Sequence, residues 1–102
     1  MSIKIRAKEK GGVTTVKCLI SHVMETGLRK DKKTGEVIPA HFIQEVKATS
    51  GDKEVLTALW GPGISKNPYL SFKFAGGAKG DKVKVTWTDN KGESDSQEGE
   101  IK

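Results

Sequence analysis

Residues 82–88 read Lys-Val-Lys-Val-Thr-Trp-Thr, and their alternation is the clearest indication of the fold class. Its apolar residues, Val83, Val85 and Trp87, alternate strictly with lysine and threonine. Such alternation is typical of a half-buried β-strand, because successive side chains of a strand point to opposite faces of the sheet. The stretch therefore predicts a strand with an apolar inner face and a polar, partly cationic outer face.

The same period of two recurs along the rest of the chain. Further strands are predicted at residues 3–8, 13–21, 41–49, 54–60 and 69–74, with a short last strand near 97–101. Within 41–49, the alternation places Phe42, Val46 and Ala48 on the core face. No long stretch shows a clean period of 3.6 residues, so little helix is expected. About seven short strands separated by turn residues predict an all-β antiparallel sandwich.

Length and composition agree with one small domain, 1–102. The 102 residues are 34% hydrophobic and 30% charged, which is polar but compatible with folding. No apolar run approaches the roughly 18 residues of a membrane span. Residues 1–10 contain no apolar segment of the kind that a secretory signal needs, so the chain is expected to carry no signal of its own.

The charge is distributed unevenly. The formal net charge is +5, but residues 1–88 have a balance of +8 and residues 89–102 a balance of −3. A basic body is compatible with a nucleic-acid partner, with an acidic protein partner or with a lysine-rich solvated surface. A small basic OB-like nucleic-acid-binding module is therefore one functional alternative. The basic loop at 29–33 contains no aromatic residue on which a base could stack, which speaks against it.

Catalytic chemistry finds little support in the residues. Cys18 and His22 are four positions apart in a predicted strand, which is roughly 13 Å and too far for a thiolate–imidazolium pair. Cys18 lies among apolar residues and is predicted to be a core residue; as the single cysteine it forms no internal disulfide. The two histidines, His22 and His41, show no metal-ligand spacing with it. We predict no catalytic, cofactor-binding or metal-binding residue, and no enzyme.

The most unusual segment is residues 60–74, WGPGISKNPYLSFKF. Proline fixes φ and glycine relaxes it, so the two proline-containing turns should give this connector one shape. Preformed loops on a rigid scaffold often carry recognition, and Trp60 and Tyr69 at its ends suit the anchoring of an interface. A plain crossover between two sheets is an equally good interpretation.

Two long segments, residues 16–42 and 60–74, resemble the SoxZ family, the small subunits of the SoxYZ sulfur carrier of bacterial thiosulfate oxidation. The resemblance extends over nearly the whole chain and includes the runs Met24-Glu25-Thr26-Gly27 and Trp60-Gly61-Pro62-Gly63. The chain has Val23 where the family pattern usually has proline after the histidine.

This resemblance implies an immunoglobulin-like β-sandwich that forms a heterodimer with SoxY. It implies that a C-terminal cysteine arm of SoxY carries the sulfur intermediates, while this chain is non-catalytic, needs no cofactor and contacts the other Sox enzymes only transiently. It also implies a periplasmic protein, co-exported with SoxY, which carries the twin-arginine signal. Neither nucleic acid nor membrane is expected as a partner.

Loops at one end of a sandwich cluster, so segments 22–27 and 60–67 are expected to form one docking surface. The competing hypothesis is that these motifs only hold turn geometry. The isolated chain is further expected to expose an apolar patch, which offers a route to a homodimer. The candidate docking residues are His22, Met24, Glu25, Thr26, Trp60, Ser65, Lys66, Asn67 and Tyr69.

Overall fold

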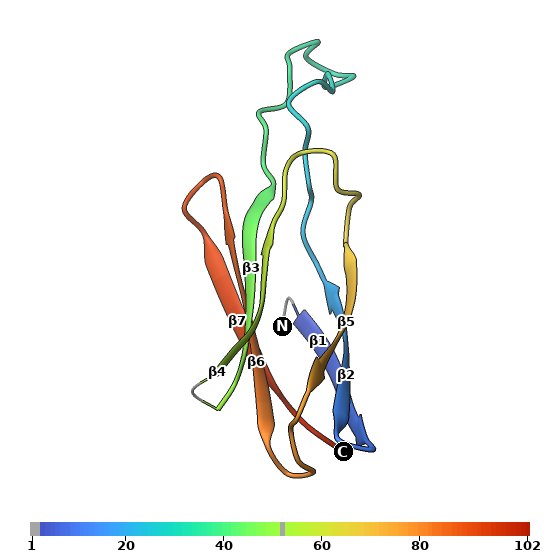
Figure 1. Ribbon diagram of the computed structural model, residues 1–102. Coiled ribbons are helices and arrows are strands. Elements are labelled where there is room, and N and C mark those ends of the chain that lie inside the picture. The colour runs from blue at the N-terminus through green and yellow to red at the C-terminus, as the bar shows by residue number, and fades with distance from the viewer. Residues whose placement is uncertain (1–2, 52) are drawn as a thin grey trace.

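The computed structural model describes residues 3–51 and 53–102, which form seven antiparallel strands and no helix (Figure 1). The strands are β1 (Ile3–Lys10), β2 (Val13–Ile20), β3 (Ile43–Ser50), β4 (Lys53–Leu59), β5 (Tyr69–Ala75), β6 (Lys82–Asp89) and β7 (Ser94–Glu100). A helix that could span a bilayer is accordingly not found in these two ranges.

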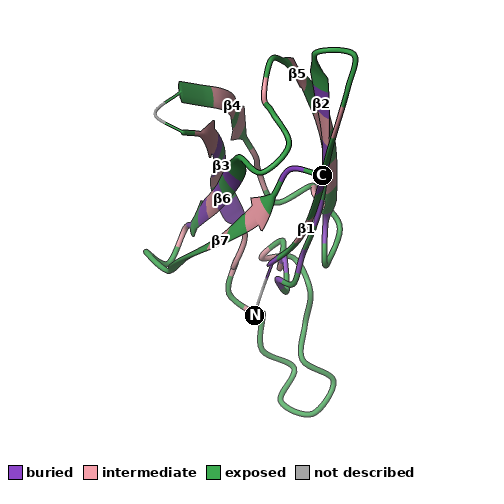
Figure 2. Ribbon diagram, turned by 90° about the horizontal axis from the view of Figure 1, so that it is seen from below, coloured by how far each residue is buried: buried purple, intermediate pink, exposed green. Residues whose placement is uncertain are grey.

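The strands build two layers, a sheet of order β1-β2-β5 and a sheet of order β4-β3-β6-β7. Figure 2 shows the two layers facing each other, with buried positions in both. The predicted all-β sandwich is thereby confirmed. In constant-type immunoglobulin domains the fourth strand joins the first sheet. Here β4 pairs with β3, so the second sheet has four strands and the first has three.

Strand β7 begins earlier than the sequence predicted, at Ser94 rather than near residue 97. It reads SDSQEGE and contains no apolar side chain, because it is an edge strand whose residues are mostly exposed. The hydrophobic alternation that reveals buried strands is therefore missing from it. Its register against β6, from Lys82 opposite Glu100 to Thr88 opposite Ser94, defines it instead.

A β-bulge changes the predicted inner face of β3. Sequence alternation predicts Phe42, Val46 and Ala48 on the core face, yet the residues of this segment with no exposed surface are Ile43, Val46 and Ala48. The pairing of β3 with β6 shifts register between Ile43 and Glu45, and a bulge of this kind lets two residues three positions apart face the same way. Phe42 lies just before the strand and packs against the core while partly exposed.

The core between the layers is made mainly of aliphatic side chains from both sheets, together with Trp87 and Met24, and includes Cys18, which is 1% exposed. Burial raises the pKa of the Cys18 thiol to about 11. At pH 8 only roughly a thousandth of such a thiol is ionised, and the thiolate is the reactive form. The predicted structural role of this cysteine is confirmed by its burial.

We therefore expect the native chain to resist alkylation. Iodoacetamide at pH 8 should modify Cys18 only in denaturant, because both burial and the raised pKa suppress the thiolate. Intact-mass measurement over time, with and without urea, checks this. Rapid modification of the folded chain would show that β2 opens more readily than its packing indicates.

The two sides of the sandwich differ. On one side the C-terminus joins β7 to β1: Lys102 N–H donates to the Ala7 carbonyl at 3.0 Å, and Glu9 N–H donates to the Lys102 carbonyl at 2.9 Å. On the other side, within residues 3–51 and 53–102, no backbone hydrogen bond joins β4 to β5. Figure 2 shows β4 and β5 opposite β1 and β7. We call this second side the open side; its inner-face residues, which are only partly buried, are Leu56, Ala58, Trp60, Leu70, Phe72 and Phe74.

The connection between β2 and β3 forms a long two-stranded ribbon, residues 22–41, that extends from one end of the sandwich (Figure 1). Isolated bridges pair Glu25 with His41 and Lys30 with Val37 along it. At the tip, the Asp31 carboxylate accepts the Lys33 amide hydrogen at 2.7 Å. The ribbon contributes to the elongated shape of the molecule, whose extents are 53 × 20 × 19 Å.

Candidate functional site

The base of the ribbon lies against the connector between β4 and β5, as the sequence predicted. The Asn67 side-chain oxygen accepts the His22 backbone N–H at 3.1 Å, and Asn67 N–H donates to the His22 carbonyl at 3.0 Å. Asn67 has a φ of 51°, a left-handed conformation that asparagine tolerates better than most residues. The expected neighbourhood of segments 22–27 and 60–67 is confirmed, whereas their docking role stays a prediction.

The candidate docking residues divide into two groups by exposure. The side chains of His22 and Met24 are buried, at 8% and 4% exposure, so they support this end of the molecule from inside. Glu25 is half-buried and forms an ion pair with the exposed Arg29 at 3.0 Å. Those that are fully or partly exposed are Glu25, Thr26, Trp60, Ser65, Lys66, Asn67 and Tyr69.

Both histidines converge on one buried carboxylate at the base of the ribbon. His22 Nε2 lies 3.1 Å and His41 Nε2 lies 2.7 Å from Asp89 Oδ2. The two rings meet edge to face with their centroids 4.6 Å apart, and His22 makes a similar contact with Trp87 at 5.0 Å. We call His22, His41 and Asp89 the histidine–aspartate cluster.

The protonation of His22 follows from its second ring nitrogen. Met24 N–H donates to His22 Nδ1 at 3.1 Å, so Nδ1 carries a lone pair and the ring proton lies on Nε2. His22 Nε2–H then donates to Asp89. Met24 holds this position with a φ of 49°, which non-glycine residues rarely adopt, and its sulfur accepts the Ile43 N–H at 3.4 Å.

Asp89 is the centre of this arrangement and is 2% exposed. Its second oxygen accepts the amide hydrogens of Lys91 at 3.0 Å and Glu93 at 2.9 Å. Burial by itself would raise the pKa of Asp89, but the hydrogen bonds from the two histidines and the two amides outweigh it and hold the pKa below its usual value. The ionised carboxylate thus ties the turn between β6 and β7 to both ends of the ribbon.

The cluster also has the spacing of a metal site, since its possible ligand atoms all lie within 4.8 Å of one another. A metal-binding histidine directs a lone pair at the ion and donates its other N–H to a neighbour. His22 has the opposite arrangement, because the Met24 amide occupies its Nδ1 lone pair and the proton faces Asp89. The geometry therefore favours a hydrogen-bonded structural cluster.

Sequence reasoning missed this cluster. The spacing of His22 and His41 in the sequence indicates no shared site, and this indication is wrong, because the fold brings both onto Asp89. The residues of the two contacts are 67 and 48 positions apart in the chain, so no local motif marks them. The sequence contains one weaker indication of the cluster. Asp89 continues the alternation of Val83, Val85 and Trp87, which places a carboxylate at an inner-face position.

A family model described as "Sulphur oxidation protein SoxZ" matches residues 3–100. No curated protein sequence matches the chain. The family match covers both sheets, the ribbon and the connector, so it concerns the whole sandwich and not a single motif.

Proposed function

Because this chain belongs to the SoxZ family of sulfur oxidation proteins, we propose that it is the non-catalytic partner subunit of a SoxY-type sulfur carrier. In this proposal SoxY holds the sulfur intermediates on its cysteine arm. The present chain covers apolar surface of SoxY and adds a rigid second sandwich by which pathway enzymes recognise the carrier. The complex is placed in the periplasm, exported together through the twin-arginine signal of SoxY.

The state of the cysteine supports a non-catalytic role. A sulfur-carrying thiol must be mobile and reactive, whereas Cys18 lies in the middle of β2, is 1% exposed and has a raised pKa. The chain has no second cysteine. The substrate thiol is thus assigned to the partner.

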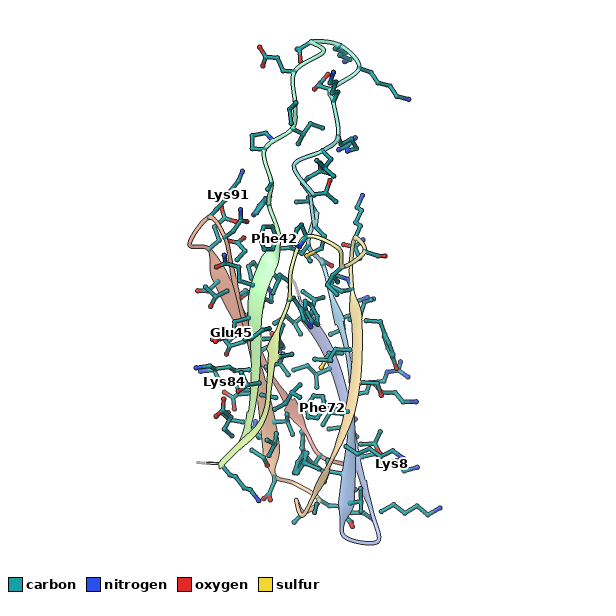
Figure 3. The ribbon with its side chains drawn as sticks, turned by 45° about the horizontal axis from the view of Figure 1, so that its top comes forward. Lys8, Phe42, Glu45, Phe72, Lys84 and Lys91 are labelled. Carbon is teal, nitrogen blue, oxygen red and sulfur yellow. The ribbon has the colours of Figure 1, made fainter. Side chains whose placement is uncertain are left out.

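The open side supports the proposal that the chain has a permanent partner. Phe72 and Phe74 on β5 and Leu56 on β4 turn toward the space between the sheets, yet remain only partly buried. Figure 3 shows Phe72 pointing into that space. Apolar inner-face residues that stay accessible at one side of a sandwich are typical of a subunit whose partner completes the core.

A nucleic-acid-binding module of OB type fits the structure poorly. An OB-fold is a five-stranded barrel, whereas the seven strands here form two separate sheets. The basic ribbon tip, at Lys32 and Lys33, has no aromatic platform beside it in the sequence. This alternative therefore loses its architectural basis.

Mixing the purified chain with SoxY and measuring the mass of the product by sedimentation tests the proposal. We expect a one-to-one complex at micromolar concentration, and self-association of the isolated chain through the open side that SoxY abolishes. A chain that stays monomeric both alone and with SoxY would contradict the proposal.

Neighbouring residues at the end of β4 offer a matched pair of variants. Trp60→Ala should weaken SoxY binding at least about tenfold, because Trp60 packs on the open side and large aromatic anchors dominate interfaces. Leu59→Ala should leave binding nearly unchanged, since Leu59 lies on the outer face of the second sheet, opposite Glu45, and is 79% exposed. Titration by calorimetry measures both. If the two variants changed SoxY binding equally, the open side would not be part of the interface.

A further inference from the structure

The outer face of the β1-β2-β5 sheet carries positive charge without acidic side chains. Alternate residues of β1 point away from the core, and every one of them is cationic: Lys4, Arg6, Lys8 and Lys10. Lys17 on β2 and Lys73 on β5 lie on the same face. Among the described residues of these three strands, the single carboxylate is that of Glu9, which occupies an inward position and accepts the Gly12 N–H at 2.9 Å. We call this surface the cationic face.

The register of the strands places the cations side by side. Arg6 is directly opposite Lys17, and Lys8 is separated from Lys73 only by Thr15. Neighbouring strands are about 4.8 Å apart and alternate residues of one strand about 6.6 Å apart, both within a Debye length at physiological salt. Like charges directly opposite each other destabilise a sheet. The cationic face is therefore a cost to the isolated fold, unless an anionic partner offsets it.

The other sheet has no such imbalance. Its outer face presents Lys47, Lys82 and Lys84 together with Glu45, Glu98 and Glu100, and cross-strand neighbours there have opposite charges: Lys82 faces Glu100, and Lys84 faces Glu98. Figure 3 shows Lys8 and Lys84 pointing away from the molecule on opposite sides. The chain thus has one neutralised face and one face on which the described charged residues that its own strands point outward are all cations, and the scatter of lysines in the sequence hides this polarity.

Apolar side chains frame the cations. Leu19 and Tyr69 lie in the row of Lys4, with 41% and 61% exposure, and Val13, at 41%, lies in the row of Lys10. A groove of about 970 Å³ runs along the edge of β1; its charged lining is Arg6, Lys8, Lys10, Lys17, Lys102 and, from β7, Glu100. Charges next to an exposed tyrosine and aliphatic residues resemble a protein interface, in which apolar anchors accompany charges that steer the encounter.

A nucleic acid fits this surface less well. Sequence-independent binding of single strands uses several aromatic side chains on which successive bases stack. Tyr69 is the one aromatic residue on this face among the described residues, and it lies at the margin on β5. The DNA major groove admits a helix or a two-stranded ribbon rather than a three-stranded sheet lying flat.

We propose that the outer face of the β1-β2-β5 sheet docks an acidic protein surface, and that this partner is distinct from the carrier subunit that covers the open side. Its carboxylates neutralise Arg6, Lys8, Lys17 and Lys73, and its apolar residues cover Leu19 and Tyr69. The inference rests on the charge pattern and stands whether or not the proposed SoxY partnership holds.

The experiment uses the full chain, alone and mixed with SoxY, and a fluorescein-labelled oligoglutamate peptide as the acidic probe. One variant replaces Lys8, Lys17 and Lys73 with glutamine; its matched control replaces Lys47, Lys82 and Lys84 with glutamine, so both lose the same charge. Fluorescence anisotropy as a function of salt reports binding. We expect the face variant to bind the peptide more weakly, by a factor of about ten or more, and with a shallower salt dependence. With three fewer cations on this face, the peptide is attracted less strongly and salt has less attraction to screen. The control should bind almost as well as the unmodified chain.

Stability provides a second readout. The face variant should be as stable as the unmodified chain or more stable, because it removes repulsion, whereas a merely structural role of these lysines predicts a loss. Equal peptide binding by the face variant and the control would overturn the proposal. A second result would also overturn it: the unmodified chain binds duplex DNA or phosphatidylglycerol vesicles at physiological salt but does not bind the peptide, and the face variant loses that binding. Loss of SoxY binding in the face variant alone would assign the face to the carrier interface and overturn the claim of a distinct partner.

Discussion

Replacing Asp89 with asparagine should lower the free energy of unfolding by about 2–4 kcal/mol, because it breaks a buried, fully hydrogen-bonded charged group. The carboxylate accepts hydrogen bonds from His22, His41 and two backbone amides. An asparagine side chain has a single acceptor oxygen, so its NH₂ group would face either the two histidine N–H groups, which share Oδ2, or the two backbone amides, which share Oδ1. Urea denaturation at neutral pH measures the loss.

The matched control is Asp31→Asn at the tip of the ribbon. Asp31 also accepts backbone amide hydrogens through its carboxylate, from Lys33 and Thr34, but it is exposed to solvent. Its replacement should change stability by no more than about 1 kcal/mol. Similar losses for Asp31→Asn and Asp89→Asn would show that the cluster stabilises no more than an ordinary turn.

The lowered pKa of Asp89 also gives this prediction a pH dependence. A carboxyl group whose pKa is lower in the folded than in the unfolded chain stabilises the fold fully at pH above the unfolded value, about 3.9. This stabilisation is lost as the pH falls from there through the folded value. The unmodified chain should therefore lose stability steeply in that acid range, and Asp89→Asn should lose less. If the free energy of unfolding fell equally steeply with decreasing pH in the two proteins, the lowered pKa of Asp89 would be contradicted.

Gly77→Ala should destabilise the chain by about 2–4 kcal/mol, the range of overpacking added to backbone strain. Gly77 has a φ of 82°, which is unfavourable for alanine, and a Cβ there would overlap the hydroxyl oxygen of Thr14. Thr14 has no room to yield, since it is fully buried and its hydroxyl donates to the Gly76 carbonyl at 2.8 Å. Thermal unfolding followed by circular dichroism measures the effect.

Gly80→Ala isolates the steric part of that loss. Gly80 has a φ of 94° but nothing within 4 Å of an added Cβ, so its replacement should cost only the backbone strain, about 1 kcal/mol. Removing the hydroxyl with Thr14→Ala should make the double variant with Gly77→Ala more stable than additivity predicts. Equal losses for Gly77→Ala and Gly80→Ala, with no coupling to Thr14, would show that the packing around Gly77 relaxes freely.

The fold class could be predicted from the sequence because it depends on a local pattern. Alternation at Val83, Val85 and Trp87 requires a half-buried strand wherever that strand lies, and the structure confirms strands at all the strongly alternating segments. Two departures have local physical causes. Because of the bulge in β3, Ile43 and not the predicted Phe42 is fully buried in the core. The exposed edge strand β7 has no apolar residues, so no hydrophobic alternation predicts it.

Part of the candidate site was also predictable. The proline- and glycine-containing connector and the segment after β2 are both unusual in composition, and loops at one end of a sandwich meet. The contact between His22 and Asn67 confirms that expectation. The burial of Cys18 was likewise expected from its apolar neighbours in β2.

The tertiary structure alone decided which polar groups meet and which surfaces are left uncovered. The convergence of His22 and His41 on Asp89 joins three segments that are distant in the chain, and it depends on the pairing along the ribbon, the contact with Asn67 and the pairing of β3 with β6. The cationic face arises because the registers of β1, β2 and β5 align cations that the sequence spreads over separate segments. The sequence predicted which side chains face inward along the regular strands, because that depends on a period of two; the bulge in β3 and the exposed edge strand β7 are the exceptions. Their neighbours across strands depend on register and sheet order, which are properties of the whole chain.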